Sequence, residues 1–164
     1  IILVLTGFSI KPIEKIINQE IDKIIENIYT NIISQINIIL EILKYSKEKD
    51  IDFRIVNLNS GAAYRPISGW SLYSSSKSYM NLFLKSLQLE EKIKIVSFDP
   101  GVVDTAMQKT IRSQNTREFD FVDMFNNYKI NGELNSPQEV ANYIWKQYIL
   151  KWQAIKFEER FIKQ

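Results

Sequence analysis

Tyr73 and Lys77 stand four residues apart in the segment Tyr-Ser-Ser-Ser-Lys. On a helix this spacing brings both side chains to one face. An ammonium group close to a phenol favours the phenolate and lowers a pKa that is about 10 in model peptides. A tyrosine with such a neighbour is suited to proton transfer, although a large shift of its pKa requires more than one exposed charge.

The spacing of Tyr73 and Lys77 is not informative by itself, because Tyr45 and Lys49 repeat it. Ser60 distinguishes the first pair. It lies thirteen residues before Tyr73, at the end of a predicted strand, whereas the residue thirteen before Tyr45 is an isoleucine. We therefore interpret Tyr45 and Lys49 as an exposed helix pair, and Ser60, Tyr73 and Lys77 as a candidate site.

The composition of the chain restricts its possible chemistry. The 164 residues contain no histidine and no cysteine, which excludes disulfide frameworks, thiol nucleophiles, Cys/His zinc sites and histidine-based triads. No metal site is expected. A net charge of +2 indicates no nucleic-acid partner. The apolar run at residues 1–5 is too short to cross a bilayer and lacks the flanks of a signal peptide, so we expect no membrane association and a cytoplasmic location.

Hydrophobic periodicity predicts alternating strands and helices. In chain order, the expected elements are a strand at 1–6, a helical stretch at 13–49 that is bent or broken near Asn27–Asn31, a strand at 54–60, a helix at 71–90, a strand at 92–98 and a helix at 136–148. The last helix begins with Ser-Pro-Gln-Glu, a capping box with proline at the first helical position. Residues 107–135 are polar with scattered phenylalanines, which indicates an irregular lid.

This order of elements is typical of a parallel α/β sheet with helices on both faces. Right-handed crossovers bring the carboxyl ends of parallel strands to one edge of the sheet, where such folds bind ligands. Ser60 and the turn Asp99-Pro100-Gly101 both follow predicted strands. The candidate residues are therefore expected to converge on one edge.

Three motifs follow one another along the chain: Asn-Leu-Asn-Ser-Gly-Ala-Ala (57–63), Gly-Trp-Ser-Leu-Tyr-Ser-Ser-Ser-Lys (69–77) and Asp-Pro-Gly-Val-Val-Asp-Thr (99–105). Together they resemble the short-chain dehydrogenases/reductases. The segments 100–112 and 135–141 are similar to the sepiapterin reductase-like branch, which includes the (S)-benzoin-forming benzil reductases. The resemblance covers about residues 12–150 and implies a Rossmann-like, doubly wound parallel sheet in three α/β/α layers.

The resemblance also implies four catalytic residues. Tyr73 corresponds to the general acid that protonates the carbonyl oxygen of the substrate, and Lys77 to the lysine that lowers its pKa and binds the nicotinamide ribose. Ser60 corresponds to the residue that holds the substrate carbonyl. Asn31 stands where the family has an asparagine that anchors a proton-relay water. The alternative for Asn31 is an ordinary surface asparagine.

The same resemblance assigns binding residues. Those expected to line the nicotinamide, besides Tyr73 and Lys77, are Pro100, Gly101, Val103 and Thr105. The alternative for Pro100 and Gly101 is a plain turn. Trp70, Met107 and the phenylalanines of the lid are expected to form an apolar substrate pocket with Ser60 and Tyr73. The same residues are equally typical of simple packing.

The glycine-rich phosphate loop of the family has no counterpart in this chain, which contains five glycines. We therefore expect residues 1–164 to be a single partial domain, the catalytic C-terminal part of one of about 250 residues. It would lack the N-terminal βαβαβ half and be truncated at its N-terminus. Such a chain is expected to bind cofactor poorly and to expose an apolar sheet edge.

Two functions remain open from the sequence. The first is a carbonyl reductase that transfers hydride to a ketone or diketone, with NADP(H) preferred over NAD(H) as cofactor. The second is a non-catalytic remnant that serves as a structural or interaction module. A small carbonyl compound is the expected substrate. A homodimer or homotetramer that pairs through the helices at 13–49 and 71–90 is the expected assembly.

Overall fold

The computed structural model describes residues 1–117 and 119–161. Four strands form one parallel sheet in the order β1-β2-β3-β4. Their bounds are β1 Ile2–Leu5, β2 Arg54–Leu58, β3 Lys94–Asp99 and β4 Glu158–Arg160. The register pairs Val4 with Val56 and Val56 with Val96, so the carboxyl ends of β1, β2 and β3 meet at one edge. The expected parallel α/β class is confirmed.

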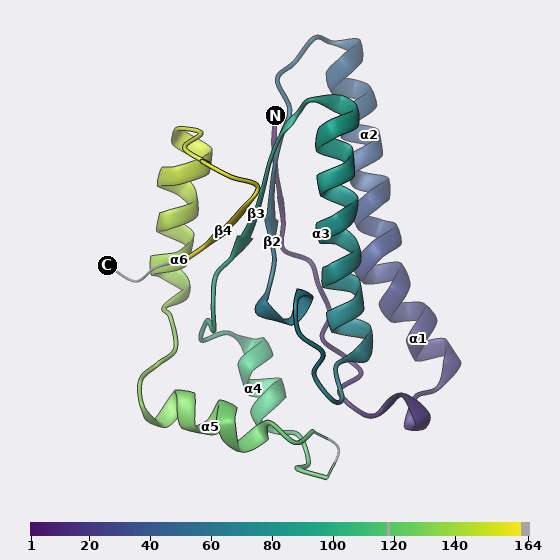
Figure 1. Cartoon of the computed structure of the whole chain (residues 1–164), viewed down its shortest axis with the longest axis vertical. Coiled ribbons are helices and arrows are strands. Elements are labelled where there is room, and N and C mark those ends of the chain that lie inside the picture. Colours follow the sequence, from purple (N-terminus) through teal and green to yellow (C-terminus); the bar gives the residue numbers. More distant parts are fainter. Residues whose placement is uncertain (118, 162–164) are drawn as a thin grey trace.

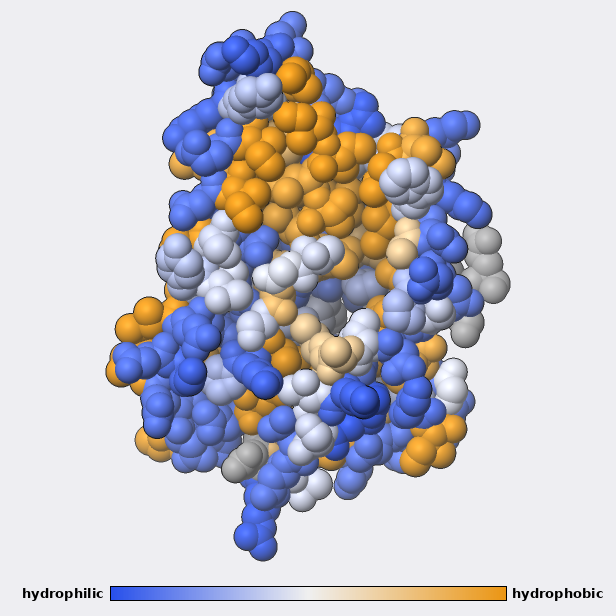
Figure 2. Space-filling model, turned by 180° about the vertical axis from the view of Figure 1, so that it is seen from behind, coloured by the Kyte–Doolittle hydropathy of each residue, from blue (hydrophilic) through white to orange (hydrophobic). Residues whose placement is uncertain are grey.

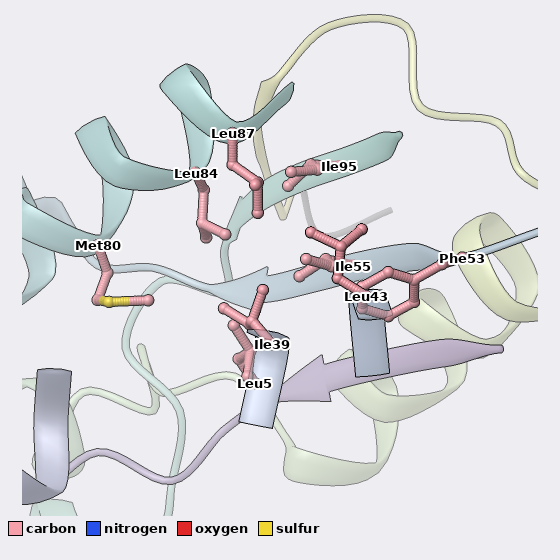
Figure 3. Close-up of a cluster of buried hydrophobic side chains, with 9 residues drawn as sticks. All are labelled: Leu5, Ile39, Leu43, Phe53, Ile55, Met80, Leu84, Leu87 and Ile95. Carbon is pink, nitrogen blue, oxygen red and sulfur yellow. The ribbon is translucent and has the colours of Figure 1, made fainter. Parts of the chain in front are cut away.

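Helices cover both faces of the sheet (Figure 1). On one side lie α2 (Ser34–Glu48) and α3 (Ser71–Glu91), and on the other lies α6 (Pro137–Ile144). Alternate residues of β2 point to opposite layers: Ile55 packs under α2 and α3, and Val56 packs with the α6 layer. Figure 3 shows the core under α2 and α3. Its buried members are Leu5, Ile39, Leu43, Phe53, Ile55, Met80, Leu84, Leu87 and Ile95. The expected three-layer arrangement is confirmed.

The predicted helical stretch at 13–49 is interrupted, as expected, near Asn27–Asn31. It consists of η1 (Ile16–Asn18), α1 (Ile21–Ile28), the π-helical turn η2 (Tyr29–Ile33) and α2. Single π turns inside helices insert an extra residue and shift the facing of the side chains. The apolar periodicity of α1 does not reach the core, because Ile21, Ile25 and Ile28 are 67%, 57% and 40% exposed.

The expectation of an irregular lid at 107–135 is wrong in part. This region contains α4 (Ala106–Arg112) and α5 (Val122–Ile130). Both helices are short and largely polar, so they carry little helical signal of their own. They are stabilised instead by packing, because Ile111, Val122 and Phe125 are buried in one apolar cluster.

The C-terminal part holds elements that the sequence did not predict. The helix that starts at Pro137 continues as a π turn, η4 (Trp145–Leu150), and the chain then returns to the sheet as β4. The predicted capping box is present: the Ser136 hydroxyl accepts from Gln138 N, and Glu139 accepts from Ser136 N. No helix in residues 1–117 and 119–161 combines the length and apolar character needed to cross a membrane.

Strand β1 is one edge of the sheet, and β4 is the other. Within the described part of the chain β1 pairs only with β2. Ile1 is exposed, and Ile2 and Val4 are partly buried in the α6 layer. Figure 2 shows a broad apolar area on the side opposite to that in Figure 1, between the two helical layers. The edge strand β1 is therefore apolar, with Ile2, Leu3 and Val4 partly buried and Leu5 buried.

Candidate active site

Helix α3 positions Tyr73 and Lys77. It begins at Ser71, so Tyr73 lies in its first turn and Lys77 one turn later. Both residues are buried, at 7% and 3% exposure. The Lys77 ammonium donates to Leu58 O at 2.5 Å and lies 5.8 Å from the centre of the Tyr73 ring. The four-residue spacing thus places both side chains on the face of α3 that meets the end of β2. By contrast, Tyr45 is 51% exposed on α2, as expected for an exposed helix pair.

Ser60 joins them from the turn after β2. It precedes the short helix η3 (Gly61–Ala63), and its hydroxyl accepts from Ala62 N at 3.2 Å. Its side chain also lies near the Tyr73 phenol, where it lowers the pKa of that group. The structure therefore brings Ser60, Tyr73 and Lys77 together at the carboxyl end of β2.

Burial sets the protonation of the pair. It raises the pKa of Tyr73 to about 12, a shift that the nearby Ser60 side chain opposes and the carboxylate of Asp99 increases. It lowers the pKa of Lys77 to about 7, and here Asp99 acts in the opposite direction. The spacing alone predicted a lowered pKa for Tyr73, whereas the structure raises it, because desolvation of the phenolate outweighs any neighbouring charge. Near pH 7 Tyr73 is a neutral phenol and hence a proton donor.

Asn31 lies in the π turn η2 and is fully buried, so it is not an ordinary surface asparagine. Its amide bonds both backbone groups of Ser9, accepting from Ser9 N and donating to Ser9 O, each at 2.7 Å. It also donates to Asn27 Oδ1 at 3.2 Å and to Ser76 Oγ at 3.4 Å. Asn31 therefore fastens the segment after β1 to α1 and α3, and reaches the candidate site through Ser76.

Phe8 belongs to the site although sequence reasoning missed it. The centre of its ring lies 3.3 Å from the Lys77 ammonium. An aromatic face attracts a cation, most strongly where water is excluded. Ser9, which Asn31 holds, is the next residue, so Asn31 also acts on the position of this ring. No spacing rule links residues 8 and 77, and no signal in the sequence alone identifies the contact.

The loop after β3 carries the predicted cofactor residues. Asp99 Oδ1 accepts from Gly101 N at 2.9 Å, and Asn135 Nδ2 donates to Pro100 O at 2.9 Å. Gly101 has φ +68°, and a Cβ there would lie 3.0 Å from Asn135 Nδ2, so the position requires glycine. Val103 forms a parallel bridge with Asn135, which secures the loop from the other side.

Thr105 follows this loop and precedes the first residue of α4, while Met107 lies within the first turn of that helix. Met107 is partly buried against an aromatic cluster built around Trp70. Trp70 stacks on Phe119 at 5.0 Å and meets Tyr73 edge-on at 5.5 Å. The predicted substrate residues thus lie beside Tyr73, where they pack against one another.

A cavity of about 630 Å³ is lined by Ser9, Lys11, Glu26, Asn27, Thr30 and Gln114, among others. None of the predicted catalytic residues lines it. The candidate site is therefore defined by the hydrogen bonds and ring contacts at the strand ends and not by this cavity. Within the described ranges, no group of three or more Asp and Glu side chains is arranged to hold a metal ion.

Comparisons with solved structures support this fold. The KRED1-Pglu enzyme superposes with a TM-score of 0.86 at 26% identity, covering 98% of this chain and 67% of that one. A short-chain dehydrogenase/reductase from Saccharomyces cerevisiae gives a TM-score of 0.80 at 22% identity, covering 97% of this chain and 64% of its own.

Curated sequences give the same result. The benzil reductase ((S)-benzoin forming) of Bacillus cereus is 37% identical over 144 residues, which are 85% of this chain and 57% of that protein. The sepiapterin reductase of Xenopus tropicalis is 31% identical over 86 residues, 51% of this chain and 33% of its own. The chain thus spans a little over half the length of the first of these relatives. The family model for short chain dehydrogenase matches residues 3–116, and the chain belongs to this family.

Proposed function

We propose that the protein is a carbonyl reductase that uses NAD(P)H, with Tyr73 as its general acid. The observation that carries the proposal is the phenol of Tyr73, which is buried, lies near Ser60, and is neutral near pH 7. A general acid must hold its proton until charge develops on the substrate oxygen. A pKa raised to about 12 meets that requirement in the direction of carbonyl reduction.

The residues present fit the nicotinamide end of such a cofactor. The Lys77 ammonium has three N–H donors. One of them bonds Leu58 O, which leaves two donors for a cofactor hydroxyl beside Tyr73. The loop Pro100–Thr105, secured by Asn135, offers backbone groups at the same sheet edge. Bound there, the cofactor would supply the hydride to the carbonyl carbon. We propose NADP(H) over NAD(H) on the resemblance to the reductase branch.

In the proposed reaction, the Ser60 hydroxyl donates to the carbonyl oxygen of the substrate and orients it toward Tyr73. As negative charge develops on that oxygen, Tyr73 transfers its phenolic proton to it, so that the product is the alcohol. Lys77 favours the resulting phenolate through its positive charge. Asn31 keeps the segment that bears Phe8, and with it the surroundings of Lys77, in place.

The rings beside Tyr73 support an aromatic ketone or diketone as substrate. Trp70 contacts Tyr73 directly, and Phe119 and Phe125 extend the aromatic surface from it. Met107 packs against the same cluster, and its flexible side chain can adapt to ligands of different shape. Benzil, which a relative from Bacillus cereus is named for reducing, is a suitable probe.

The decisive experiment compares the wild type with Tyr73→Phe. We expect benzil reduction at millimolar NADPH by the wild type and a loss of about 10²- to 10⁴-fold in kcat for the variant, with unchanged NADPH binding. Binding itself is expected to be weaker than micromolar, because the chain has no glycine-rich loop for the phosphates. Equal turnover by both proteins would refute the role of Tyr73.

The second candidate function is a non-catalytic interaction module, and the open apolar edge at β1 favours it. Under this alternative, the purified chain neither binds NADPH at millimolar concentration nor reduces benzil. The same measurements therefore separate the two functions.

We also propose that two copies pair through α1, η2 and α3. Ile21, Ile25 and Ile28 form an exposed apolar row on α1, and Leu82 is 67% exposed on α3. Exposed apolar rows like that on α1 mark association sites. Sedimentation equilibrium should give a dimer or tetramer for the wild type and a monomer for Ile25→Lys.

A further inference from the structure

A group of polar side chains is buried behind Ser60, between α3 and the sheet. Its members, which we call the strand-end network, are Asn57, Asn59, Asn81, Ser97 and Glu158. All except Glu158 are buried. They come from α3, β3 and β4 and from the end of β2, so the network joins the elements that carry the candidate site.

Asn81 is the centre of the network. Its Oδ1 accepts from Ser97 Oγ at 2.7 Å and from Asn59 Nδ2 at 3.1 Å. Its Nδ2 donates to Glu158 Oε1 at 2.9 Å. An ionised carboxylate only accepts hydrogen bonds, so Glu158 determines which end of the amide faces it. The oxygen of Asn81 is thereby directed toward Asn59 and Ser97.

The Asn81 side chain is connected to the candidate site in two ways. Asn81 follows Lys77 by four residues and Tyr73 by eight, so the three share one face of α3. Asn59 directly precedes Ser60, and its Nδ2 also donates to Tyr64 Oη at 3.0 Å, just beyond η3. The turn that bears Ser60 is thus held at both ends by a group bonded to Asn81.

We propose that Asn81 is a positioning residue: it sets the Ser60 turn relative to Tyr73 and Lys77, and Glu158 holds its amide in the required orientation. The catalytic consequence of this inference rests on the proposed reductase function. The alternative is that Asn81 only satisfies buried polar groups and stabilises the fold without bearing on the site.

Asn81→Asp separates these possibilities through pH. It keeps the acceptor for Asn59 and Ser97 but places a carboxyl group against Glu158. Two adjacent carboxylates cannot both ionise easily, so one pKa of the pair rises. The other groups that face Glu158 are Lys85, paired with it at 2.5 Å, and Tyr64, while Lys77, Asp99 and its partner Arg160 are charged groups on the side of the site. Protonated, the variant can donate to Glu158; ionised, it repels it.

We therefore expect kcat of Asn81→Asp, relative to the wild type at each pH, to be near normal at about pH 5.5 and to fall as the pH rises to about 8. Asn81→Leu should lose about 100-fold at every pH, the scale of a misplaced reacting group. The exchanged pair N81D/E158Q should recover activity at the higher pH, because the glutamine amide then donates to the new carboxylate. Asn142→Asp, on the exposed surface of α6, is the matched control and should follow the wild type.

Hydrogen exchange of the amides of residues 61–64 gives a readout that needs no activity. We expect Asn81→Asp to lose protection there as the pH rises, beyond the ordinary acceleration seen in the control, and N81D/E158Q to restore it. If the wild type reduces no carbonyl compound but this pattern appears, the proposed function fails and the positioning role stands. Loss of protection or activity without pH dependence and without rescue, or no change at all, overturns the inference.

Discussion

The two sides of Tyr73 differ in what holds them. Behind it, toward the sheet, Lys77, Asn81 and Asn59 are fixed by hydrogen bonds whose donors and acceptors can each be named. In front of it, Trp70, Phe119 and Phe125 form an aromatic cluster fixed by ring contacts. Hydrogen bonds on the polar side fix the orientation of the side chains, whereas ring contacts on the aromatic side only require that the space be filled. The first should respond to loss of a single donor or charge, and the second to loss of bulk.

The largest effect on stability is expected on the aromatic side. Trp70→Ala should lower the free energy of unfolding by about 3–5 kcal/mol, because it opens a cavity between Tyr73, Phe119 and Phe125. Trp70→Phe keeps an aromatic ring there and should cost less than about 1.5 kcal/mol. Urea denaturation measures both. If the two variants lose equal stability, the volume of the residue 70 side chain does not determine the stability of the aromatic cluster.

On the polar side, the buried Lys77 should make the free energy of unfolding depend on pH. Burial lowers the pKa of Lys77 from 10.5 to about 7, so the folded protein binds fewer protons than the unfolded chain between these values. Its unfolding free energy should therefore rise with pH across this window, by about 1.4 kcal/mol per unit of pKa difference. Lys77→Met should lack this rise.

Urea denaturation between about pH 6 and pH 10 checks the prediction. Below pH 7 the free energy of unfolding of Lys77→Met should rise relative to that of the wild type, because only the wild type then buries a charged group. Lys146→Met, on the surface of α6's continuation η4, is the control and should keep the wild-type slope. Parallel curves for wild type and Lys77→Met would contradict the buried ammonium.

A smaller effect is expected at Asn31. Asn31→Ala removes both bonds to the partly buried Ser9 and leaves its backbone N–H without that acceptor, which should cost about 1–3 kcal/mol. It should also loosen Phe8 over Lys77, so the fall in kcat should exceed what global unfolding explains. Chemical denaturation and steady-state kinetics at one pH give both quantities. Ser34→Ala, which removes a side-chain bond to Thr30 O in the neighbouring turn, is the control.

The smallest effect is expected outside both sides. Tyr45→Phe removes a hydroxyl from the second Tyr–Lys pair, which is exposed on α2. Surface substitutions of this kind usually change stability by less than about 0.5 kcal/mol. Reductase activity should equal that of the wild type, in contrast to Tyr73→Phe. Any loss of turnover here would show that the spacing rather than the surroundings of Tyr73 carries the chemistry.

The fold was predictable where local pattern and tertiary environment agree. The strands at residues 54–58 and 94–99 are short, β-branched and buried, and the helix after Ser71 is long and periodic. The short helices α4 and α5 and the strand β4 were missed, because their stability comes from distant partners rather than from propensity. Glu158 in β4, for instance, bonds Asn81 across 77 positions of sequence.

The candidate site was predictable to a similar degree. The convergence of Ser60, Tyr73 and Lys77 followed from spacing and from the order of the strands, and the structure places the three side chains near one another. Asn81 could have been found from the sequence, because it follows Lys77 by four residues and so lies on the same face of the helix. Phe8 could not, because its contact depends on the path of the segment that Asn31 holds.

By itself, the sequence determined the order of the first three strands and of the long helices that follow them, the shared helix face of Tyr73 and Lys77, and that any proton transfer uses neither histidine nor cysteine. These depend on residue type and on short, regular spacing. Only the tertiary structure decided that Tyr73 keeps its proton near pH 7, that Lys77 is buried, and which way the Asn81 amide points. Those properties depend on exclusion of water and on hydrogen bonds between residues far apart in the chain, which local pattern does not encode.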